Sequence, residues 1–330
     1  MNTSTHKPKV SIVMSFYNEP LQWIRFALES VIGQTFGDWE LIVICDNPEY
    51  AEGISYIQGI GDKRIRLMIN QENVGPTRSF NIAIAASKGE YIARMDADDI
   101  CLPERLEKQV AYLDSHPETS MCATDAHTID DKGKITRRRR YRRKLEPELL
   151  FISNCFAHPS VIFRRSILED RNPIYNEDFI YSQDYELWQF LFLKGHRFHT
   201  LEQALLLYRK SDSQISSAKR RKQVELFKKA HESFITDWLI KHGVIATDER
   251  GDMKVMLEKA SHAYPKASPE GRKCLKYIIY ILYYSLGTLE KKYRLRYLTD
   301  RNLIAFRIRF IYTYRLLFSI RTRRDRSGLV

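Results

Sequence analysis

The 330-residue chain has no long hydrophobic run. Its longest apolar stretch, about Tyr277 to Leu286, is shorter than the roughly 20 residues that a helix needs to cross a bilayer. No apolar segment follows the polar first residues, so we expect no secretory signal. These absences predict a cytoplasmic protein.

Cysteine is also scarce. Five cysteines are scattered along the chain, an odd number without the paired spacing of a zinc site or a disulfide framework. We therefore expect free and mostly buried thiols at Cys45, Cys101, Cys122, Cys155 and Cys274.

Acidic residues are outnumbered, with 41 Asp and Glu against 53 Lys and Arg. Much of the excess lies in residues 290–330, which hold 12 basic and 3 acidic residues. A second basic run extends from Arg137 to Lys144 and is either a solvated loop or a phosphate-binding segment. Because no nucleic-acid-binding module with a basic stripe is recognisable, we expect no nucleic-acid partner.

The length and the 44% hydrophobic content predict a globular chain with one large domain and an appendage, or two domains. In the first half, short apolar runs alternate with segments of helical periodicity. The runs are Val10–Ser15, Glu40–Cys45, Ile65–Ile69 and Tyr91–Met95. This alternation predicts a mostly parallel sheet with helices on both faces, whose ligands bind beyond the carboxyl ends of the strands.

The fourth of these runs ends in three carboxylates within four positions, Asp96, Asp98 and Asp99. Carboxylates this close raise one another's pKa unless a cation or hydrogen-bond donors compensate them. Oxygen ligands of this kind suit Mg²⁺ or Mn²⁺, which substrate phosphates commonly help to coordinate. A solvated acidic turn, or an N-cap of a helix that begins near Leu102, is the alternative.

Polar residues also follow the other three strands. They form the segments Ser15–Glu19, Asp46–Asn47 and Asn73–Arg78. Together with the acidic cluster they supply an aromatic ring for a base, an acid for a base or sugar, an arginine for phosphate and carboxylates for a metal. Their occurrence at successive strand ends predicts a single nucleotide site.

These segments resemble the inverting glycosyltransferases of family 2, and the resemblance covers about Lys9 to Ser216. The further matching segments are Gly89–Pro103, His158–Arg165, Gln183–Trp188 and Leu207–Arg209. The resemblance implies the GT-A fold, a Rossmann-like, mostly parallel sheet with helices on both faces. It predicts a catalytic domain over residues 1–216, with a nucleotide-binding half at 9–100 and an acceptor half at 101–216, and a basic helical C-terminal region at 217–330.

For the donor, the resemblance implies a UDP-sugar and a bound Mn²⁺ or Mg²⁺. Ser15, Tyr17 and Glu19 would hold uracil and ribose, and Asp46 the edge of the base. Arg78 would lie near the base or phosphates. Asp96 would contact the ribose, and Asp98 the metal.

For the reaction, the resemblance assigns Asp184 as the base that takes a proton from the acceptor hydroxyl. Gln183 stands where the family more often has glutamate. The alternative is that Asp184 caps the following helix. Inversion follows if the activated hydroxyl attacks the face opposite the leaving group.

Two other residues keep two interpretations each. His158 lies in a segment that lines the acceptor side in the family, where it would orient the acceptor or its phosphate, or it is structural. Arg209 either neutralises the diphosphate or pairs with a structural acid. Ser211 stands where the family often has histidine, so we assign no metal ligand there.

Beyond about residue 217 the resemblance fades. Lys219–Leu239 is expected to be a helix, and residues 274–330 mix apolar and aromatic residues with arginines. Such a region is typical of peripheral attachment to the anionic cytoplasmic face of an inner membrane. A helical appendage packed on the catalytic domain or on another subunit is the alternative, and the oligomeric state stays open.

Taken together, these patterns predict transfer of a sugar from a UDP-sugar to a hydroxyl of a glycan or lipid-linked acceptor in lipopolysaccharide, capsule or exopolysaccharide synthesis. The alternative is a non-catalytic sugar-nucleotide-binding or scaffold homologue. The presence of both Asp98 and Asp184 argues against it. Neither the sugar nor the acceptor linkage can be read from spacing.

Overall fold

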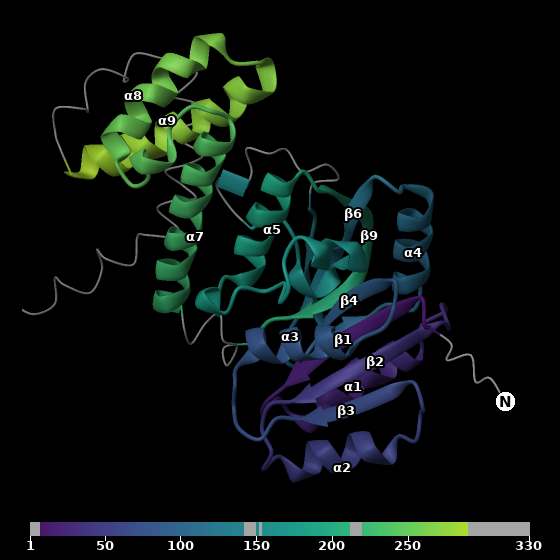
Figure 1. Cartoon of the computed structure of the whole chain (residues 1–330). Helices are drawn as coiled ribbons and strands as arrows, with labels where there is room; N and C mark the ends of the chain where they lie inside the picture. The colour runs from purple at the N-terminus through teal and green to yellow at the C-terminus, as the bar shows by residue number, and fades with distance from the viewer. Residues whose placement is uncertain (1–6, 142–149, 152–153, 212–219, 290–330) are drawn as a thin grey trace, which may run out of the picture. The chain divides into compact units, whose positions relative to one another are not determined.

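The computed structural model describes residues 7–141, 150–151, 154–211 and 220–289. The chain divides into two compact units (Figure 1). The first combines residues 1–145 with 155–219, and the second combines 146–154 with 220–330. Every strand in the described part of the chain belongs to the first unit.

The first unit begins with alternating strands and helices, as the sequence predicts. In order these are β1 (Val10–Phe16), α1 (Leu21–Ile32), β2 (Trp39–Cys45), α2 (Ala51–Gly59), β3 (Ile65–Ile69), α3 (Pro76–Ala86) and β4 (Tyr91–Asp96). The strands are parallel and lie in the order β3-β2-β1-β4. The carboxyl ends of all four therefore lie at one edge.

The rest of the unit extends this sheet to nine strands in the order β3-β2-β1-β4-β8-β6-β9-β5, with β7 paired to β6. Its elements are β5 (Ile100–Cys101), α4 (Arg105–Ser115), β6 (Thr119–Ile129), β7 (Ile135–Arg139), η2 (His158–Ser160), β8 (Ile162–Arg164), η3 (Arg165–Glu169), η4 (Glu177–Phe179), α5 (Gln183–Lys194) and β9 (Arg197–Arg209). Strand β9 runs parallel to β6, whereas β5, β7 and β8 pair antiparallel with their neighbours.

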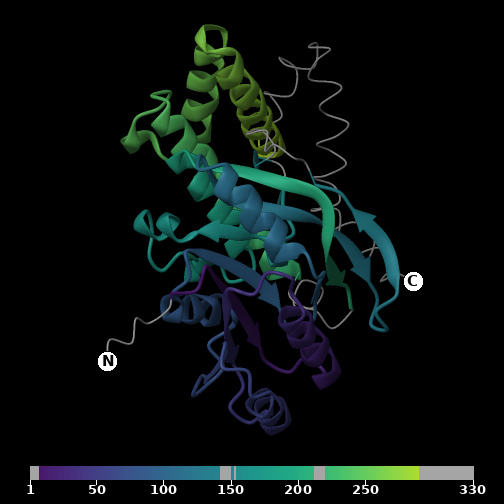
Figure 2. The ribbon, with the colours of Figure 1, turned by 90° about the vertical axis from the view of Figure 1, so that its right-hand side faces the viewer.

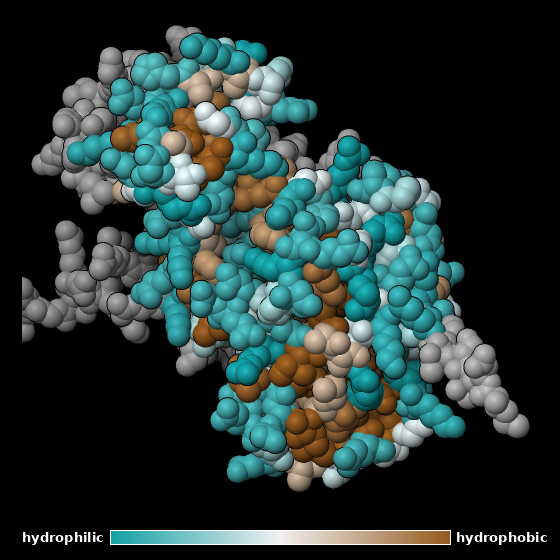
Figure 3. Space-filling model, in the orientation of Figure 1, coloured by the Kyte–Doolittle hydropathy of each residue, from teal (hydrophilic) through white to brown (hydrophobic). Residues whose placement is uncertain are grey.

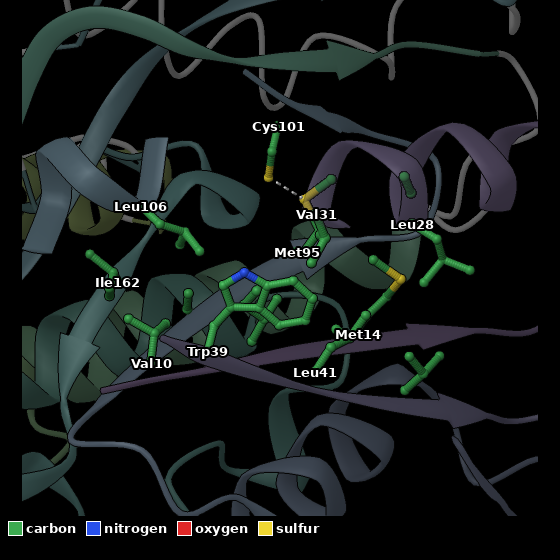
Figure 4. Close-up of a cluster of buried hydrophobic side chains, with 14 of the residues drawn as sticks. Val10, Met14, Leu28, Val31, Trp39, Leu41, Met95, Cys101, Leu106 and Ile162 are labelled. Carbon is green, nitrogen blue, oxygen red and sulfur yellow. Dashed lines mark hydrogen bonds between the residues drawn. The ribbon is translucent and has the colours of Figure 1, made fainter. Parts of the chain in front are cut away.

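Helices cover both faces of the parallel strands, which confirms the expected layering. Figure 2 shows α1 and α3 on opposite sides of β1. On one face, α1 buries Ile24, Leu28 and Val31 in a cluster with Met14. Each of those three α1 side chains contributes about 1.5–3 kcal/mol relative to exposure. Figure 4 shows Leu28 and Val31 beside Met14 in this cluster.

Glycine 89 fixes the start of β4 against β1. A Cβ atom at this position would lie 2.4 Å from the backbone nitrogen of Ser11. The Gly89 amide also donates to Ser11 Oγ at 2.6 Å. Only a residue without a side chain fits there, and the close approach sets where β4 and the acidic turn after it lie beside β1.

Strand β3 is only partly buried. Ile65, Leu67 and Met68 are half-buried, and Ile69 is exposed. Figure 3 shows a largely hydrophilic surface with apolar side chains gathered in the region where β1 to β3 and α3 are drawn in Figure 1. The edge of the parallel sheet thus carries exposed apolar surface.

The second unit is helical in its described part. It contains α7 (Arg220–Lys241), η5 (Thr247–Glu249), α8 (Met253–Ala263), η6 (Tyr264–Lys266) and α9 (Pro269–Leu289). Phe151 packs on Phe234 of α7, with ring centroids 4.6 Å apart. Helix α7 confirms the helix expected at Lys219–Leu239. The basic, aromatic-rich pattern expected beyond α9 lies outside the described residues.

Two expectations from composition concern the described part of the chain. None of its helices is both long and apolar enough to span a membrane. Its five cysteines are free, and all except the half-buried Cys155 are buried. The expectation of free and mostly buried thiols is therefore confirmed.

Candidate active site

The three carboxylates of the acidic cluster converge at the end of β4. Asp96, Asp98 and Asp99 each offer an oxygen that lies within 4.8 Å of the others. Helix α4 begins at Arg105 with Glu104 as its N-cap, so the helix-cap alternative for Asp98 or Asp99 is wrong. A solvated turn is also wrong for Asp99, because its side chain is fully buried.

The buried carboxylate of Asp99 is the strongest indication of metal binding. Its Oδ1 accepts a hydrogen bond from the backbone N–H of Arg209 at 2.7 Å. Its Oδ2 is buried without a partner in the part of the chain that the structure describes. Burial, then the charges of Asp98 and Asp96, raise the pKa of Asp99 well above its usual value. A divalent cation that prefers oxygen ligands fits this set, because it would satisfy the unpaired oxygen and offset the crowded charge.

Arg209 holds the acidic turn in place. Its Nε donates to the carbonyl oxygen of Asp98 at 2.7 Å, and its Nη1 donates to that of Asp130 at 2.8 Å. The guanidinium also lies over the ring of Trp23, 4.8 Å from the centroid. Of the two interpretations, the geometry supports a structural one. The guanidinium donates to backbone carbonyls, whereas Asp99 is bound by the Arg209 backbone N–H.

Arg94 pairs with Asp96 in a way that the sequence reasoning missed. Two guanidinium nitrogens of Arg94 each lie 2.5 Å from an oxygen of Asp96. Arg94 is 6% exposed and its guanidinium lies 4.6 Å from the ring centroid of Phe80. The available signal was strand alternation, which puts residues 94 and 96 on the same face. The pair fixes the orientation of the Asp96 carboxylate.

The carboxyl end of β1 lies beside Asp96. Ser15 is paired in register with Asp96 on the neighbouring strand. Tyr17 is 42% exposed, and its backbone N–H donates to Glu19 Oε2 at 2.7 Å. Burial raises the pKa of Glu19, the Tyr17 amide opposes this, and Asp96 adds to it. Ser15 and Glu19 therefore share the electrostatic surroundings of the acidic cluster.

Asp46, after β2, builds the loop before α3. Its Oδ1 accepts from Asn70 Nδ2 at 2.7 Å and from the Val74 N–H at 3.0 Å, and its Oδ2 accepts from the Gly75 N–H at 2.9 Å. Gly75 has φ +83°, a left-handed conformation that favours glycine. The loop leads into the first turn of α3, where Arg78 is exposed. Asp46 thus shapes the segment that presents Arg78.

Asp184 lies in the first turn of α5, whose N-cap is Ser182. The N-cap alternative for Asp184 is therefore wrong. The side chain is half-buried, and its Oδ1 accepts from the Tyr185 N–H at 2.8 Å. The pKa of Tyr175 is raised by burial and also by the charges of both Asp184 and Asp96. The fold thus brings both carboxylates within electrostatic range of one buried tyrosine.

His158 lies behind that tyrosine. Its Nε2 is 2.7 Å from Tyr175 Oη, and its ring contacts Phe80 and Trp188 at centroid distances of 6.3 and 5.8 Å. Burial, followed by the charge of Arg94, lowers the pKa of His158 well below its usual value, so the ring is neutral. His158 is thus a buried side chain that contacts Tyr175, Phe80 and Trp188. Tyr175 itself was not singled out in the sequence.

The sequence of this chain is similar to those of known proteins. The sequence model of the family described as "Glycosyl transferase family 2" matches residues 11–171. An uncharacterized glycosyltransferase of Methanocaldococcus jannaschii, MJ1057, is 35% identical over 223 residues, which span 66% of this chain and 76% of that protein. An Escherichia coli relative, UDP-Glc:alpha-D-GlcNAc-diphosphoundecaprenol beta-1,3-glucosyltransferase WfgD, is 29% identical over 213 residues, 64% of this chain and 80% of that protein.

Solved structures resemble the fold. The crystal structure of S. aureus TarS 1-349 in complex with UDP-GlcNAc superposes with a TM-score of 0.59 over 84% of this chain and 92% of that one. The two sequences are 17% identical, so this likeness is one of fold. With the layered sheet described above, it confirms the expected architecture.

Proposed function

The chain belongs to glycosyltransferase family 2, and we therefore propose that it transfers a sugar, with inversion, from a UDP-sugar to a hydroxyl of a glycan or lipid-linked acceptor in surface polysaccharide synthesis. The observation that carries the proposal is the acidic turn, where three carboxylate oxygens lie within 4.8 Å of one another beyond a parallel strand. The names of WfgD and of the TarS complex, which include UDP-Glc and UDP-GlcNAc, support a uridine donor.

The donor nucleotide would lie along the ends of β1, β2 and β4. The exposed ring of Tyr17 is available to stack on uracil, with Ser15 and Glu19 beside the ribose. Asp46 would meet the base edge from the loop that it shapes. Arg78, which the same loop presents, would reach the phosphates.

Asp98 and Asp99 would hold a divalent metal ion, Mn²⁺ or Mg²⁺, and Asp96 would contact the ribose. The unpaired Oδ2 of Asp99 supports a ligand role, either directly or through water. Such an ion would offset negative charge on the leaving diphosphate as a Lewis acid. Arg94 keeps Asp96 oriented throughout, because both terminal nitrogens of its guanidinium bind that carboxylate.

Asp184 would act as the general base. As the acceptor oxygen bonds to the anomeric carbon, its proton passes to Asp184, and the bond from that carbon to the β-phosphate oxygen breaks. The electron pair leaves with UDP. Asp184 would activate the hydroxyl on the face opposite UDP, and attack from that face inverts the anomeric centre. Half-burial leaves the Asp184 carboxylate reachable by a hydroxyl.

Release of UDP from a panel of UDP-sugars with Mn²⁺, with and without chelator, tests this function. General-base catalysis contributes about 10²–10⁴-fold, so Asp184→Asn should lose transfer by that amount. It should still bind UDP, as a UDP-dependent rise in melting temperature would show. Asp98→Ala should lose transfer both with Mn²⁺ and with chelator. Asp178→Asn, which neutralises an exposed acid in η4, is the matched control. Transfer retained in either active-site variant would overturn the assignment.

Attachment to an anionic membrane through residues 274–330 belongs to the same proposal, since a lipid-linked acceptor is presented at a membrane. Attachment is supported by the composition of residues 290–330, which hold 12 basic and only 3 acidic residues. Full-length protein should sediment with anionic vesicles in a salt-sensitive way. Replacement of four of those arginines by glutamine should weaken sedimentation, and unchanged sedimentation would count against attachment.

A further inference from the structure

The first four arginines of the basic run lie in an exposed segment of the chain. Arg137, Arg138 and Arg139 lie in β7, and Arg140 follows it directly. All four are exposed. Side chains alternate along a strand, so Arg137 and Arg139 share one face while Arg138 and Arg140 point to the other. The two pairs have different surroundings.

Arg138 and Arg140 compensate a buried acid. Asp125 of β6 is 3% exposed, and its Oδ2 lies 3.8 Å from Arg138 Nη2. The same Nη2 donates to the carbonyl oxygen of Glu202 at 3.1 Å. Burial raises the pKa of Asp125, and the charges of Arg138 and Arg140 oppose that rise. Structural stabilisation accounts for this pair.

Arg137 and Arg139 share the face of the sheet that carries Tyr208. Across the sheet, Thr128 of β6 is paired with both Arg137 and Tyr208, and Ala126 is paired with Arg139. Because Ala126 carries only a methyl group, the long side chain of Arg139 can cross it. The guanidinium of Arg139 lies 5.1 Å from the ring centroid of Tyr208.

Tyr208 connects this face to the acidic turn. It precedes Arg209, whose backbone N–H binds Asp99. Burial raises the pKa of Tyr208, and the charges of Asp99 and Asp96 contribute, while Arg139 opposes the rise. Tyr208 therefore contacts Arg139 and lies within electrostatic range of the carboxylates of the proposed metal site.

Arg137 and Arg139 lie two residues apart on one face of a strand, so their like charges repel each other. Within the described part of the chain no carboxylate lies within ion-pair distance of Arg137 or Arg139. The donor diphosphate would already be met by a divalent ion and Arg78 on the other side of the turn. A neutral hydroxyl acceptor would leave this positive charge without a use, whereas an acceptor phosphate would match it.

We propose that Arg137 and Arg139 bind a phosphate group of the acceptor, so that the acceptor is a saccharide linked to a phosphate or diphosphate rather than a neutral glycan. This inference rests on the proposed function. It assigns to the arginine face of β7 a second anion site, distinct from the donor diphosphate site.

Direct binding tests the site without requiring transfer. The probe is a water-soluble, short-chain prenyl diphosphate, titrated by calorimetry into full-length protein saturated with UDP and Mn²⁺. We expect binding that Arg137→Gln/Arg139→Gln weakens about 10- to 100-fold, the effect of losing two solvent-exposed ionic contacts. The matched control is Lys132→Gln/Lys134→Gln, which removes two exposed charges from the same hairpin. Absent binding, binding that occurs only when UDP is left out, or equal weakening in the control would overturn the inference.

Transfer kinetics test the consequence for the acceptor. The wild type should show a lower KM for a short-chain diphosphate-linked saccharide than for the same saccharide as an alkyl glycoside. Arg137→Gln/Arg139→Gln should raise only the first KM and leave the donor KM unchanged. An equal rise for both acceptors would contradict a phosphate contact. Failure of the wild type to use any donor, with probe binding intact, would instead overturn the proposed function.

The same anionic chemistry could come from lipid headgroups. Sedimentation with anionic vesicles that lack any prenyl diphosphate separates the two sources. The acceptor site predicts equal sedimentation of the wild type and the arginine variant. Loss of sedimentation in the variant without loss of probe binding would show that this face of β7 meets a membrane surface, which would overturn the acceptor assignment.

Discussion

Replacing Asp99 by asparagine should stabilise the metal-free protein and reduce the further stabilisation that Mn²⁺ adds. Asp99 is fully buried, and one of its oxygens has no partner in the described part of the chain. Asparagine keeps the oxygen that accepts from the Arg209 N–H. Its amide group would then donate toward the neighbouring carboxylates of Asp96 and Asp98, which replaces repulsion by attraction.

The magnitude follows from the cost of a buried unsatisfied group, about 1–3 kcal/mol. For a unit of about 200 residues, 1 kcal/mol shifts the melting temperature by about 2–4 °C, so the expected rise in chelator is about 2–12 °C. In Mn²⁺ the difference between the two proteins should narrow. At 100 times its Kd, Mn²⁺ should add about 2.7 kcal/mol to the wild type, and less to the variant, which has lost a ligand.

Thermal unfolding in chelator and across a Mn²⁺ titration is the assay, with Asp178→Asn as the control for loss of one exposed negative charge. A variant less stable than the wild type in chelator would refute the reasoning, because the carboxylate would then already be compensated within the protein. An unchanged Mn²⁺ response would remove Asp99 from the metal site while leaving Asp98 in question.

Three further outcomes are expected. Arg94→Met should raise the KM for the UDP-sugar at least tenfold with a smaller change in kcat, because Asp96 loses its orienting partner. Steady-state kinetics would check this, and Arg94→Lys should restore the KM in part. Burial lowers the pKa of His231 to about 4. Because the unfolded chain binds this proton already near pH 6.5, the helical unit should lose about 3 kcal/mol of stability as the pH falls from about 6.5 to 4. Chemical unfolding at several pH values should show that His231→Leu flattens this dependence. Gly89→Ala should destabilise the sheet by about 1–3 kcal/mol or more in denaturant titrations, because its Cβ would lie 2.4 Å from the Ser11 nitrogen; a silent substitution would show that β4 can move away from β1.

The sequence could predict the parallel half of the fold because its signals are local. Apolar runs of strand length, helical periodicity and the polar residues at strand ends all lie within short windows, and β1 to β4 match them to within about two residues. The acidic turn and the placement of Asp46 and Arg78 followed from the rule that parallel strands share one ligand-binding edge. The mixed part of the sheet, from β5 to β9, could not be predicted in the same detail, because antiparallel partners far apart in sequence leave no local pattern.

The chemistry available at the strand ends could thus be read from the residues in order: carboxylates for a metal, a base and an anion-binding arginine. Which of these groups support one another emerges only in the folded chain. Arg94 lies against Asp96, Arg209 binds the acidic turn from more than 100 residues away, and the arginines from Arg137 to Arg140 divide between a buried acid and the Tyr208 face. Such pairings depend on strand register and burial, which arise only when distant segments pack together.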